Sequence, residues 1–422
     1  MSLRRCTVVM AAMAAMIVPA ACGGDESGSE GQPADEGGTL TFANWQWQEP
    51  GRGEAIFKAV AAYNEENPQA RIEKVEITRA DYEKTISTQI GSGGGPDILI
   101  SPAAFFFTMA DSEVLEPLDG VLSRQQVASL RPNNKEFRVG GEQLAYIWGM
   151  APYALFWNKQ VLDEAGVKPP KTFQELIAAA EQVNERTGKI GFVTRHQLNE
   201  EASWWEDFSS WPYGFGGGWS TGGDLTINSP ENVAALTAFE KIYDSGAFGV
   251  GDDASTFRSK FAAGDVGFVL DNASVVSTAI ADSDSVTAAD IGSSALPFPG
   301  SSSAAQMNVI GINANSTNKR LAKDFVRWLF ERQTQIDMAD AQFPASAGTN
   351  VSPPRDKLEA NPWVGAFLDQ LEEAQPTVVP GFEIETPALR NIILTRIQEV
   401  LTSETTPQEA LDSAQEDASG LR

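Results

Sequence analysis

Apolar residues recur along the chain with two alternating periods, which predicts strands and helices in turn. Residues 40–43, 71–77 and 97–100 are short β-prone runs. Between these runs, apolar side chains recur every three to four positions, as on one face of a helix, at Ile56, Val60, Tyr63, Tyr82, Ile86 and Ile90. Asn67 and Pro68 end the first of these helices. This βαβαβ order favours a parallel sheet with helices on its faces, which is an α/β fold.

The rest of the chain repeats this alternation with clear helix starts. Thr172 and Glu175 have the spacing of a capping box, and Pro230 follows Ser229 at the first turn of another predicted helix. Further amphipathic helices are predicted around residues 257–261, 318–332, 386–397 and 410–411, and a strand at 266–270.

Composition and charge exclude several classes of function. The chain has 422 residues, enough for two or three domains. It carries 31 Lys and Arg against 57 Asp and Glu, a formal net charge of −26, so a nucleic-acid backbone would be repelled. The single histidine, His196, and two cysteines cannot supply a zinc site of four cysteines, of paired cysteines and histidines or of three histidines, nor the histidine-based triad of a serine hydrolase. We expect no metal and no cofactor, and any enzyme chemistry would rest on carboxylates.

Residues 1–22 have the organisation of a secretory signal peptide. Arg4 and Arg5 precede an apolar stretch at 7–21, and Cys22 follows small residues. This segment resembles a bacterial lipoprotein signal, in which the cysteine becomes the lipidated first residue, although Pro19 stands where Leu or Val is usual. The resemblance implies anchoring to the outer face of the cytoplasmic membrane through Cys22. Residues 23–37, rich in Gly, Ser and acid, predict a flexible tether. The alternative is ordinary secretion with Cys22 unmodified.

Four longer strings resemble one protein family in the same order. They are APYALFWNKQVLDEAGVKPPKTFQEL from residue 151, FAAGDVGFVLDNASVV from 261, ALPFPG from 295 and MNVIGINANSTNKRLAKDFVRWLF from 307. All are similar to family 1 extracellular solute-binding proteins, the maltose-binding-protein-like receptors of ABC importers. The resemblance implies a two-lobed periplasmic-binding-protein fold, in which each lobe is a mainly parallel sheet flanked by helices and the ligand lies in the cleft between them.

The resemblance also implies that each lobe is discontinuous in sequence. We expect lobe 1 to comprise residues 38–143 and 307–344, and lobe 2 to comprise residues 144–306 and 345–422. Hinge closure around the ligand would then present a shape that a membrane permease reads. A monomer is the expected state of such a receptor.

Tryptophan placement points to a carbohydrate ligand. Six of the ten tryptophans fall in Gly-, Pro- or polar-rich segments: Trp45, Trp47, Trp204, Trp205, Trp211 and Trp219. A sugar presents a flat C–H face and a rim of hydroxyls, so its site needs aromatic plates beside carboxylates and amides. The alternative for each tryptophan is packing inside a lobe.

Candidate contacts follow the predicted strands, because α/β folds bind ligands outside the carboxyl ends of strands. The resemblance implies the following set: Trp47, Gln48, Glu49, Ser101, Phe105, Glu206, Phe208, Trp211, Asp271 and Asn272. The aromatic pattern adds Trp204 and Trp205. Ser274 and the region of Arg390 lack an aromatic residue that is frequent in the family, which argues against the maltodextrin subclass.

Two other functions remain open from the sequence, besides that of a purely structural or adhesive lipoprotein. A glycoside hydrolase needs two carboxylates, and Glu49 and Glu206 from opposite lobes are the candidates, although no hydrolase motif is recognised. The second is a receptor for another polar solute, such as a polyamine, glycerol phosphate or ferric ion. Acidic Glu49, Glu206 and Asp271 suit a polyamine, whereas a phosphate ester requires Arg or Lys, which these loops lack.

Overall fold

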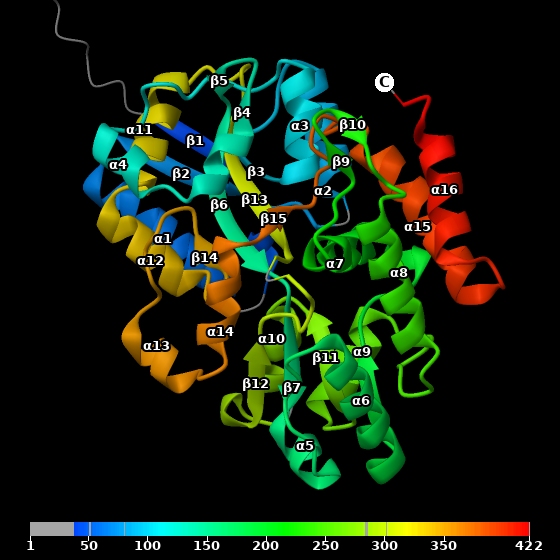
Figure 1. The fold of residues 1–422 in the computed structure, drawn as a ribbon. Helices are drawn as coiled ribbons and strands as arrows, with labels where there is room; N and C mark the ends of the chain where they lie inside the picture. Colours follow the sequence, from blue (N-terminus) through cyan, green and yellow to red (C-terminus); the bar gives the residue numbers. More distant parts are fainter. Residues whose placement is uncertain (1–37, 50–51, 80, 283–285, 301, 422) are drawn as a thin grey trace, which may run out of the picture. The chain divides into compact units, whose positions relative to one another are not determined.

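The computed structural model describes residues 38–49, 52–79, 81–282, 286–300 and 302–421, and Figure 1 shows two β-sheets flanked by helices in this part. The expected signal peptide, the tether and Cys22 lie outside the described residues. The first sheet has the strand order β14-β6-β13-β3-β1-β2, with β15 pairing with β13. Its strands are β1 (Gly38–Ala43), β2 (Ala70–Val75), β3 (Ile98–Pro102), β6 (Ala145–Pro152), β13 (Ala304–Ile312), β14 (Ser346–Ala347) and β15 (Gln375–Pro376).

The first half of this sheet confirms the βαβαβ prediction. Strand β1 pairs in parallel with both β2 and β3, and the three apolar residues of β3 are fully buried because helices cover both faces. Strand β13 then pairs antiparallel with β3 and with β6. The sheet is therefore mixed, with a parallel half extended by antiparallel strands.

Six helices among the described residues accompany the first sheet, and all but α4 bury an apolar face. They are α1 (Arg52–Glu66), α2 (Tyr82–Gly91), α3 (Ala103–Asp111), α4 (Arg124–Ser129), α11 (Lys319–Leu329) and α12 (Arg332–Ala341). Phe325 of α11 meets Tyr63 of α1 edge-on at 5.2 Å between ring centroids, and it also meets Phe42 of β1 at 5.8 Å. The two segments predicted around 56–63 and 318–332 thus form one core against β1.

The second sheet has the order β12-β7-β11-β8. Its strands are β7 (Ala154–Asn158), β8 (Ile190–Val193), β11 (Val266–Asp271) and β12 (Ile291–Ser294). Only β11 and β8 pair in parallel, so this sheet is also mixed. Two short pairs, β4 (Arg138–Val139) with β5 (Glu142–Gln143) and β9 (Ser220–Thr221) with β10 (Asp224–Leu225), stand apart from both sheets.

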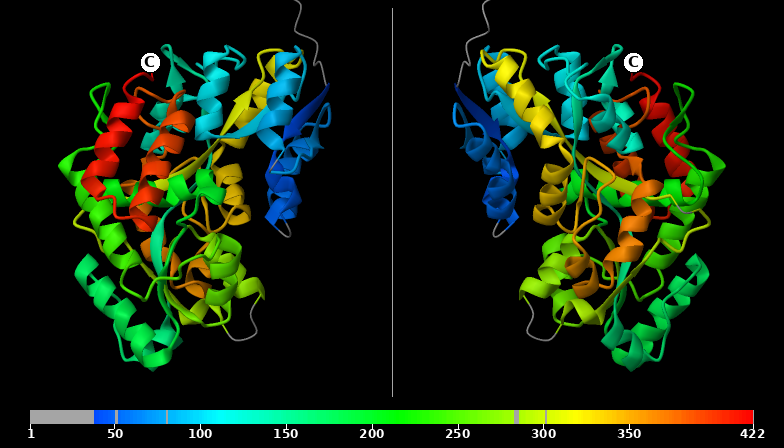
Figure 2. Two further views of the ribbon diagram at one scale, coloured as in Figure 1. Left: turned by 90° about the vertical axis from the view of Figure 1, so that its right-hand side faces the viewer. Right: turned by 90° about the vertical axis from the view of Figure 1, so that its left-hand side faces the viewer.

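Ten helices among the described residues surround the second sheet or follow it. They are α5 (Lys159–Ala165), α6 (Phe173–Thr187), α7 (Glu201–Gly214), α8 (Pro230–Tyr243), α9 (Ala254–Ala262), α10 (Ser274–Asp282), α13 (Arg355–Ala360), α14 (Val364–Asp369), α15 (Thr386–Thr402) and α16 (Pro407–Ala418). Thr172 caps α6 by accepting from the Glu175 amide, while the Glu175 carboxylate accepts from Lys171 instead of closing the predicted box. The last two helices lie side by side and pack with α7 and α8 in one core (Figure 2).

The chain changes sheet later than the sequence suggested. Strand β6 runs to Pro152 in the first sheet and β7 begins at Ala154 in the second, so the change falls at Tyr153 and not at residue 144. The reason is that residues 145–152 find their hydrogen-bond partners on β13. Strand β14 likewise pairs with β6, so the part of the chain that belongs to the first sheet extends beyond residue 344.

No helix among the described residues has the length and apolar character needed to span a bilayer.

Candidate functional site

A cavity of about 540 Å³ lies where the two sheets meet. One wall comes from the segment after β1, a second from α7 and from the segment after β11, and the floor from β6, β13 and the chain before β14. We refer to this cavity as the cleft. Its lining places polar groups from both sheets around one space, which a ligand could bridge.

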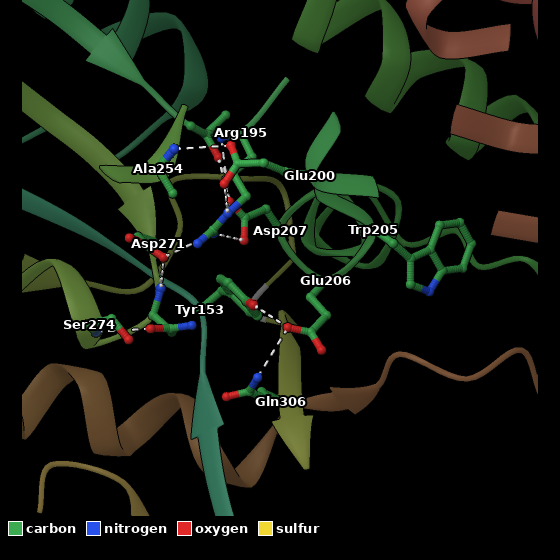
Figure 3. Close-up of polar contacts among 12 residues, drawn as sticks. Tyr153, Arg195, Glu200, Trp205, Glu206, Asp207, Ala254, Asp271, Ser274 and Gln306 are labelled. Carbon is green, nitrogen blue, oxygen red and sulfur yellow. Dashed lines mark hydrogen bonds and ion pairs between the residues drawn. The ribbon is translucent and has the colours of Figure 1, made fainter. Parts of the chain in front are cut away.

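Glu206 of α7 is a polar group of the cleft lining that contacts the other sheet. Its Oε2 accepts a hydrogen bond from the Tyr153 hydroxyl at 3.0 Å and another from Nε2 of Gln306 in β13 at 3.4 Å (Figure 3). Burial raises the pKa of the Glu206 carboxyl, against the lowering effects of the Tyr153 hydrogen bond and the nearby Arg195 and Arg79 charges. Because Glu206 is still partly exposed to the cleft, it can accept hydrogen bonds from a ligand.

A buried ion network supports this wall from behind (Figure 3). Arg195 contacts both oxygens of Asp207 at 2.8 and 2.9 Å and reaches Asp271 at 3.3 Å. Arg258 binds Asp271 through two bonds of 2.8 and 3.0 Å. Burial opposes ionisation of Asp271, but the Arg258 and Arg195 charges hold its pKa below the ordinary value. Two arginines and two aspartates thus compensate one another while both guanidinium groups line the cleft.

The wall after β1 is a short 3₁₀ helix, η1 (Trp45–Gln48), which explains which side chains face the cleft. Three residues complete one turn of such a helix, so Trp45 and Gln48 point the same way; both line the cleft, as does the buried Gln46. Trp47 points elsewhere: its indole donates to the Phe42 carbonyl at 3.1 Å and packs against Phe57. Trp45 and not Trp47 is therefore the aromatic side chain of this segment that lines the cleft.

Two arginines stand beside this wall. The Arg79 guanidinium lies 5.0 Å from the centroid of the Trp45 ring and pairs with exposed Glu83 at 3.0 Å. Arg52 pairs with Glu49 at 3.0 Å, and both side chains are partly exposed. Both arginines line the cleft, which corrects the expectation that cationic side chains are lacking there. They were missed because α1 and the turn before α2 supply them, and not the strand-end loops.

Side-chain amides form part of the cleft floor. Gln342 donates to the Trp148 carbonyl at 2.9 Å, while its Oε1 is buried with no partner among the described residues. Asn308 Oδ1 is buried and unpartnered in the same part of the chain. Buried acceptors are normally satisfied, so these two oxygens are positioned to receive donors from a ligand or water.

Four of the predicted contact residues line the cleft: Gln48, Glu49, Glu206 and Asn272. Asn272 is held in place because its Oδ1 accepts from the Ser274 amide at 2.9 Å. The structure does not bring Ser101 or Phe105 to the cleft. Ser101 is buried in β3 opposite Val309, and Phe105 belongs to the core over the first sheet.

Three aromatic residues of α7 that the sequence suggested as ligand contacts are core residues in the structure. Residues 201–214 form a helix and not a connection, so Trp204, Phe208 and Trp211 recur on one face and are sealed in the core. Trp211 meets Phe298 at 4.6 Å and Phe239 at 5.0 Å between ring centroids. The spacing of four and three residues was the available indication of this helix.

Trp205 and Asp271 are also absent from the cleft lining. Trp205 donates to the Thr377 carbonyl and stacks on Trp219 at 5.0 Å, and it points away from the Tyr153–Glu206 pair (Figure 3). Asp271 lies behind the wall, where it binds Arg258. Glu206 reaches the cleft because it stands one turn after Ser203, which also lines it.

Comparison with known proteins places these features in context. A family model described as bacterial extracellular solute-binding protein matches residues 58–366. The chain is 24% identical over 411 residues to the sn-glycerol-3-phosphate-binding periplasmic protein UgpB of Shigella dysenteriae, covering 89% of this chain and 91% of that protein. The protein of the same name from Escherichia coli K12 is also 24% identical, over 416 residues, with the same coverage of both chains.

Solved structures share the fold. The cyclic α-maltosyl-1,6-maltose binding protein of Arthrobacter globiformis superposes with a TM-score of 0.80 at 20% identity, covering 91% of this chain and 99% of that one. The GacH receptor of Streptomyces glaucescens, solved with and without acarbose, gives 0.77 at 23% identity, covering 91% and 98%. Maltose-bound MalE3 of T. maritima gives 0.76 at 22% identity, covering 90% and 98%. The two-sheet architecture is therefore the two-lobed fold of these binding proteins.

Proposed function

Because the chain belongs to the bacterial extracellular solute-binding protein family, we propose that it captures a mono- or oligosaccharide and delivers it to the permease of an ABC importer. The similar solved structures support this proposal, since they are described as binding cyclic α-maltosyl-1,6-maltose, acarbose or maltose. The UgpB proteins are named for sn-glycerol 3-phosphate, which belongs to the alternative class of polar solutes. The observation that carries it is the cleft, where Trp45 of one lobe faces the same cavity as Glu206 and Asn272 of the other.

Each of these side chains suits a sugar. The Trp45 indole offers an apolar plate for a C–H face, and Glu206 offers an acceptor for hydroxyl groups. Asn272 adds an amide whose orientation is fixed by Ser274. A ligand bound to groups from both lobes stabilises the closed arrangement only by the difference between its contacts in the closed and the open form.

The alternatives are less compatible with the cleft. A polyamine would meet four arginines in the described lining, and Asp271, one of the acids that favoured it, is already bound to Arg258. A glycoside hydrolase would have to use Glu49 and Glu206, but Glu49 is held by Arg52 and the similar proteins are named for binding. We therefore retain capture without chemical change.

Tryptophan fluorescence tests the proposal. Among the described tryptophans, Trp45 is the one in the cleft lining, whereas Trp211 is sealed in a core. Titration with mono- and oligosaccharides should give a saturable change that Trp45→Phe removes and Trp211→Phe retains, with the sugar recovered intact. If no sugar changed the tryptophan fluorescence, or if a sugar were recovered in cleaved form, the proposal would be refuted.

We further propose that residues 1–22 are a lipoprotein signal peptide and that Cys22 anchors the mature chain to the outer face of the cytoplasmic membrane. The proposal rests on Arg4, Arg5 and the apolar stretch before Cys22. Residues 23–37 would give the receptor reach toward a permease, and we expect it to act as a monomer. Cys22→Ala should release the protein from membranes of the native host, while Cys6→Ala should leave it attached; unchanged attachment of Cys22→Ala would refute the anchor.

A further inference from the structure

The four arginines of the cleft fall into two groups with different partners. Arg195 and Arg258 are bound by Asp207 and Asp271 at distances of 2.8 to 3.3 Å, and these acids are fully buried. Their charges are therefore compensated inside the protein. An acidic group on a ligand would gain little from them.

Arg52 and Arg79 are compensated more weakly. Their partners, Glu49 and Glu83, are partly exposed, and exposed ion pairs contribute little to stability. Arg52 Nε is buried and unpartnered among the described residues, although Nη1 of the same group binds Glu49. A guanidinium carries five donors in a fixed fork and can bind a second carboxylate or phosphate. Each of these two arginines, both of which line the cleft, can therefore receive an anion.

The floor of the same cleft needs hydrogen-bond donors from a ligand, whereas the arginines need acceptors. Asn308 Oδ1 and Gln342 Oε1 are buried acceptors without partners in the described chain, and Gln342 as a whole is fully buried. They need O–H or N–H donors. Ammonium groups would supply such donors but would be repelled by the arginines, so hydroxyl groups fit both features.

We infer that the ligand is an acidic sugar or polyol whose carboxylate or phosphate is held by Arg79 and Arg52 beside Trp45, and whose hydroxyl groups donate to Asn308 and Gln342. This inference rests on the proposed function and specifies its ligand class. Since the chain carries a formal charge of −26, most of its surface repels anions, and the cleft arginines supply the local attraction. The Arg79 guanidinium lies 5.0 Å from the centroid of the Trp45 ring. A sugar ring that contacts the indole would therefore lie close to the guanidinium that binds its acidic group.

Matched ligand pairs test the inference by isothermal titration calorimetry on the purified protein. The carboxylate pairs are glucose with glucuronate and galactose with galacturonate, and the phosphate pairs are glycerol with glycerol 3-phosphate and glucose with glucose 6-phosphate. The acidic member of at least one pair should bind about 10- to 100-fold more tightly than its neutral partner, as expected for a charged hydrogen bond. This preference should fall as salt rises. The pairs that show this preference identify the acidic group of the ligand as a carboxylate or a phosphate.

Arg79→Gln is the diagnostic variant, because the side chain is half exposed and its loss leaves both cores intact. It should remove most of the preference for the acidic member, whereas the exposed control Arg355→Gln should keep it. Equal binding of both members in every pair, or a preference that survives Arg79→Gln, would overturn the inference while leaving capture of neutral sugars in place. No binding of any member, extended to neutral oligosaccharides, would overturn the proposed function as well.

Discussion

Gln306 of the first sheet donates a hydrogen bond from Nε2 to Oε2 of Glu206 on α7, at 3.4 Å, and both residues line the cleft. The same oxygen accepts from Tyr153, the single residue between the strands that join the two sheets. Glu206 is thus connected to the opposite lobe and to the crossing segment. Substitution of Glu206 therefore tests which groups of the cleft contribute to ligand affinity.

Glu206→Gln should weaken ligand binding by about 1.5–3 kcal/mol, the usual contribution of a hydrogen bond to a charged group. Because burial raises the pKa of Glu206, wild-type affinity should be full above that raised pKa and should fall as pH decreases through it. The variant should lose this pH dependence. Calorimetric titrations from pH 4.5 to 8 measure both effects, and a variant with wild-type affinity would remove Glu206 from the site.

Tyr153→Phe provides a matched control for the pH effect. The hydroxyl stabilises the carboxylate form of Glu206, so its removal should raise the pKa of Glu206 further. The fall in affinity should then begin at higher pH than in wild type. A profile that moves to lower pH, or does not move, would mean that another group controls the pH dependence.

Trp45→Ala and Trp211→Ala should separate binding from stability. Loss of the cleft indole should reduce affinity by about 1–3 kcal/mol, by analogy with aromatic stacking on bases. Loss of the sealed indole should instead lower the free energy of unfolding by about 3–5 kcal/mol, because it leaves a cavity among Phe173, Phe239 and Phe298. Urea unfolding and ligand titration of both variants check this. The reverse pattern would restore Trp211 as a contact.

These two tryptophans show which parts of the fold could be predicted from the sequence and which could not. Regular 3.6-residue periodicity predicted α1, α2 and α11, and alternation of strands and helices predicted the parallel pairs of β1. Residues 201–214 were misread because Gly, Pro and Ser surround their aromatics, although tertiary packing on the second sheet holds them in a helix. Local composition could not indicate that packing.

The predicted contact residues and the cleft lining differ for a related reason. Trp45 and Trp47 have the same local context, and only the turn of η1 decides which of them faces the cleft. Arg79 and Gln306 come from segments far apart in the chain, so their convergence depends on the fold and not on any motif. Gln48, Glu49, Glu206 and Asn272 were identified because they follow strands or carry family motifs.

Asp271→Asn should strongly destabilise the protein, because it leaves Arg258 and Arg195 without one of their buried acids. Breaking a buried pair in this way costs about 3–5 kcal/mol. Glu359→Gln, which breaks the exposed pair with Arg355, should change the free energy of unfolding by less than about 1 kcal/mol. Denaturant unfolding of the two variants measures the difference, and equal effects would show that the buried network has no special role.

His196 should make stability depend on pH. Its Nε2 accepts from the Gly251 amide at 2.8 Å and its Nδ1 lies 2.9 Å from the Thr194 carbonyl, an arrangement that fits the neutral ring. Burial lowers the pKa of His196, so its contribution is present above the unfolded-state pKa and is lost as pH falls through the folded-state value. Between pH 7 and 5, wild type should lose more unfolding free energy than His196→Gln. Equal losses would assign the pH dependence to other groups.

Equilibrium dialysis against a mixture of neutral and acidic mono- and oligosaccharides, read by mass spectrometry, tests reversible capture in the cleft most directly. Wild type should retain one intact hydroxylated ligand per chain, and Trp45→Ala and Glu206→Gln should release it, while Arg355→Gln should not. Retention by both cleft variants, a ligand recovered in cleaved form, or no retention at all would refute reversible capture in the cleft.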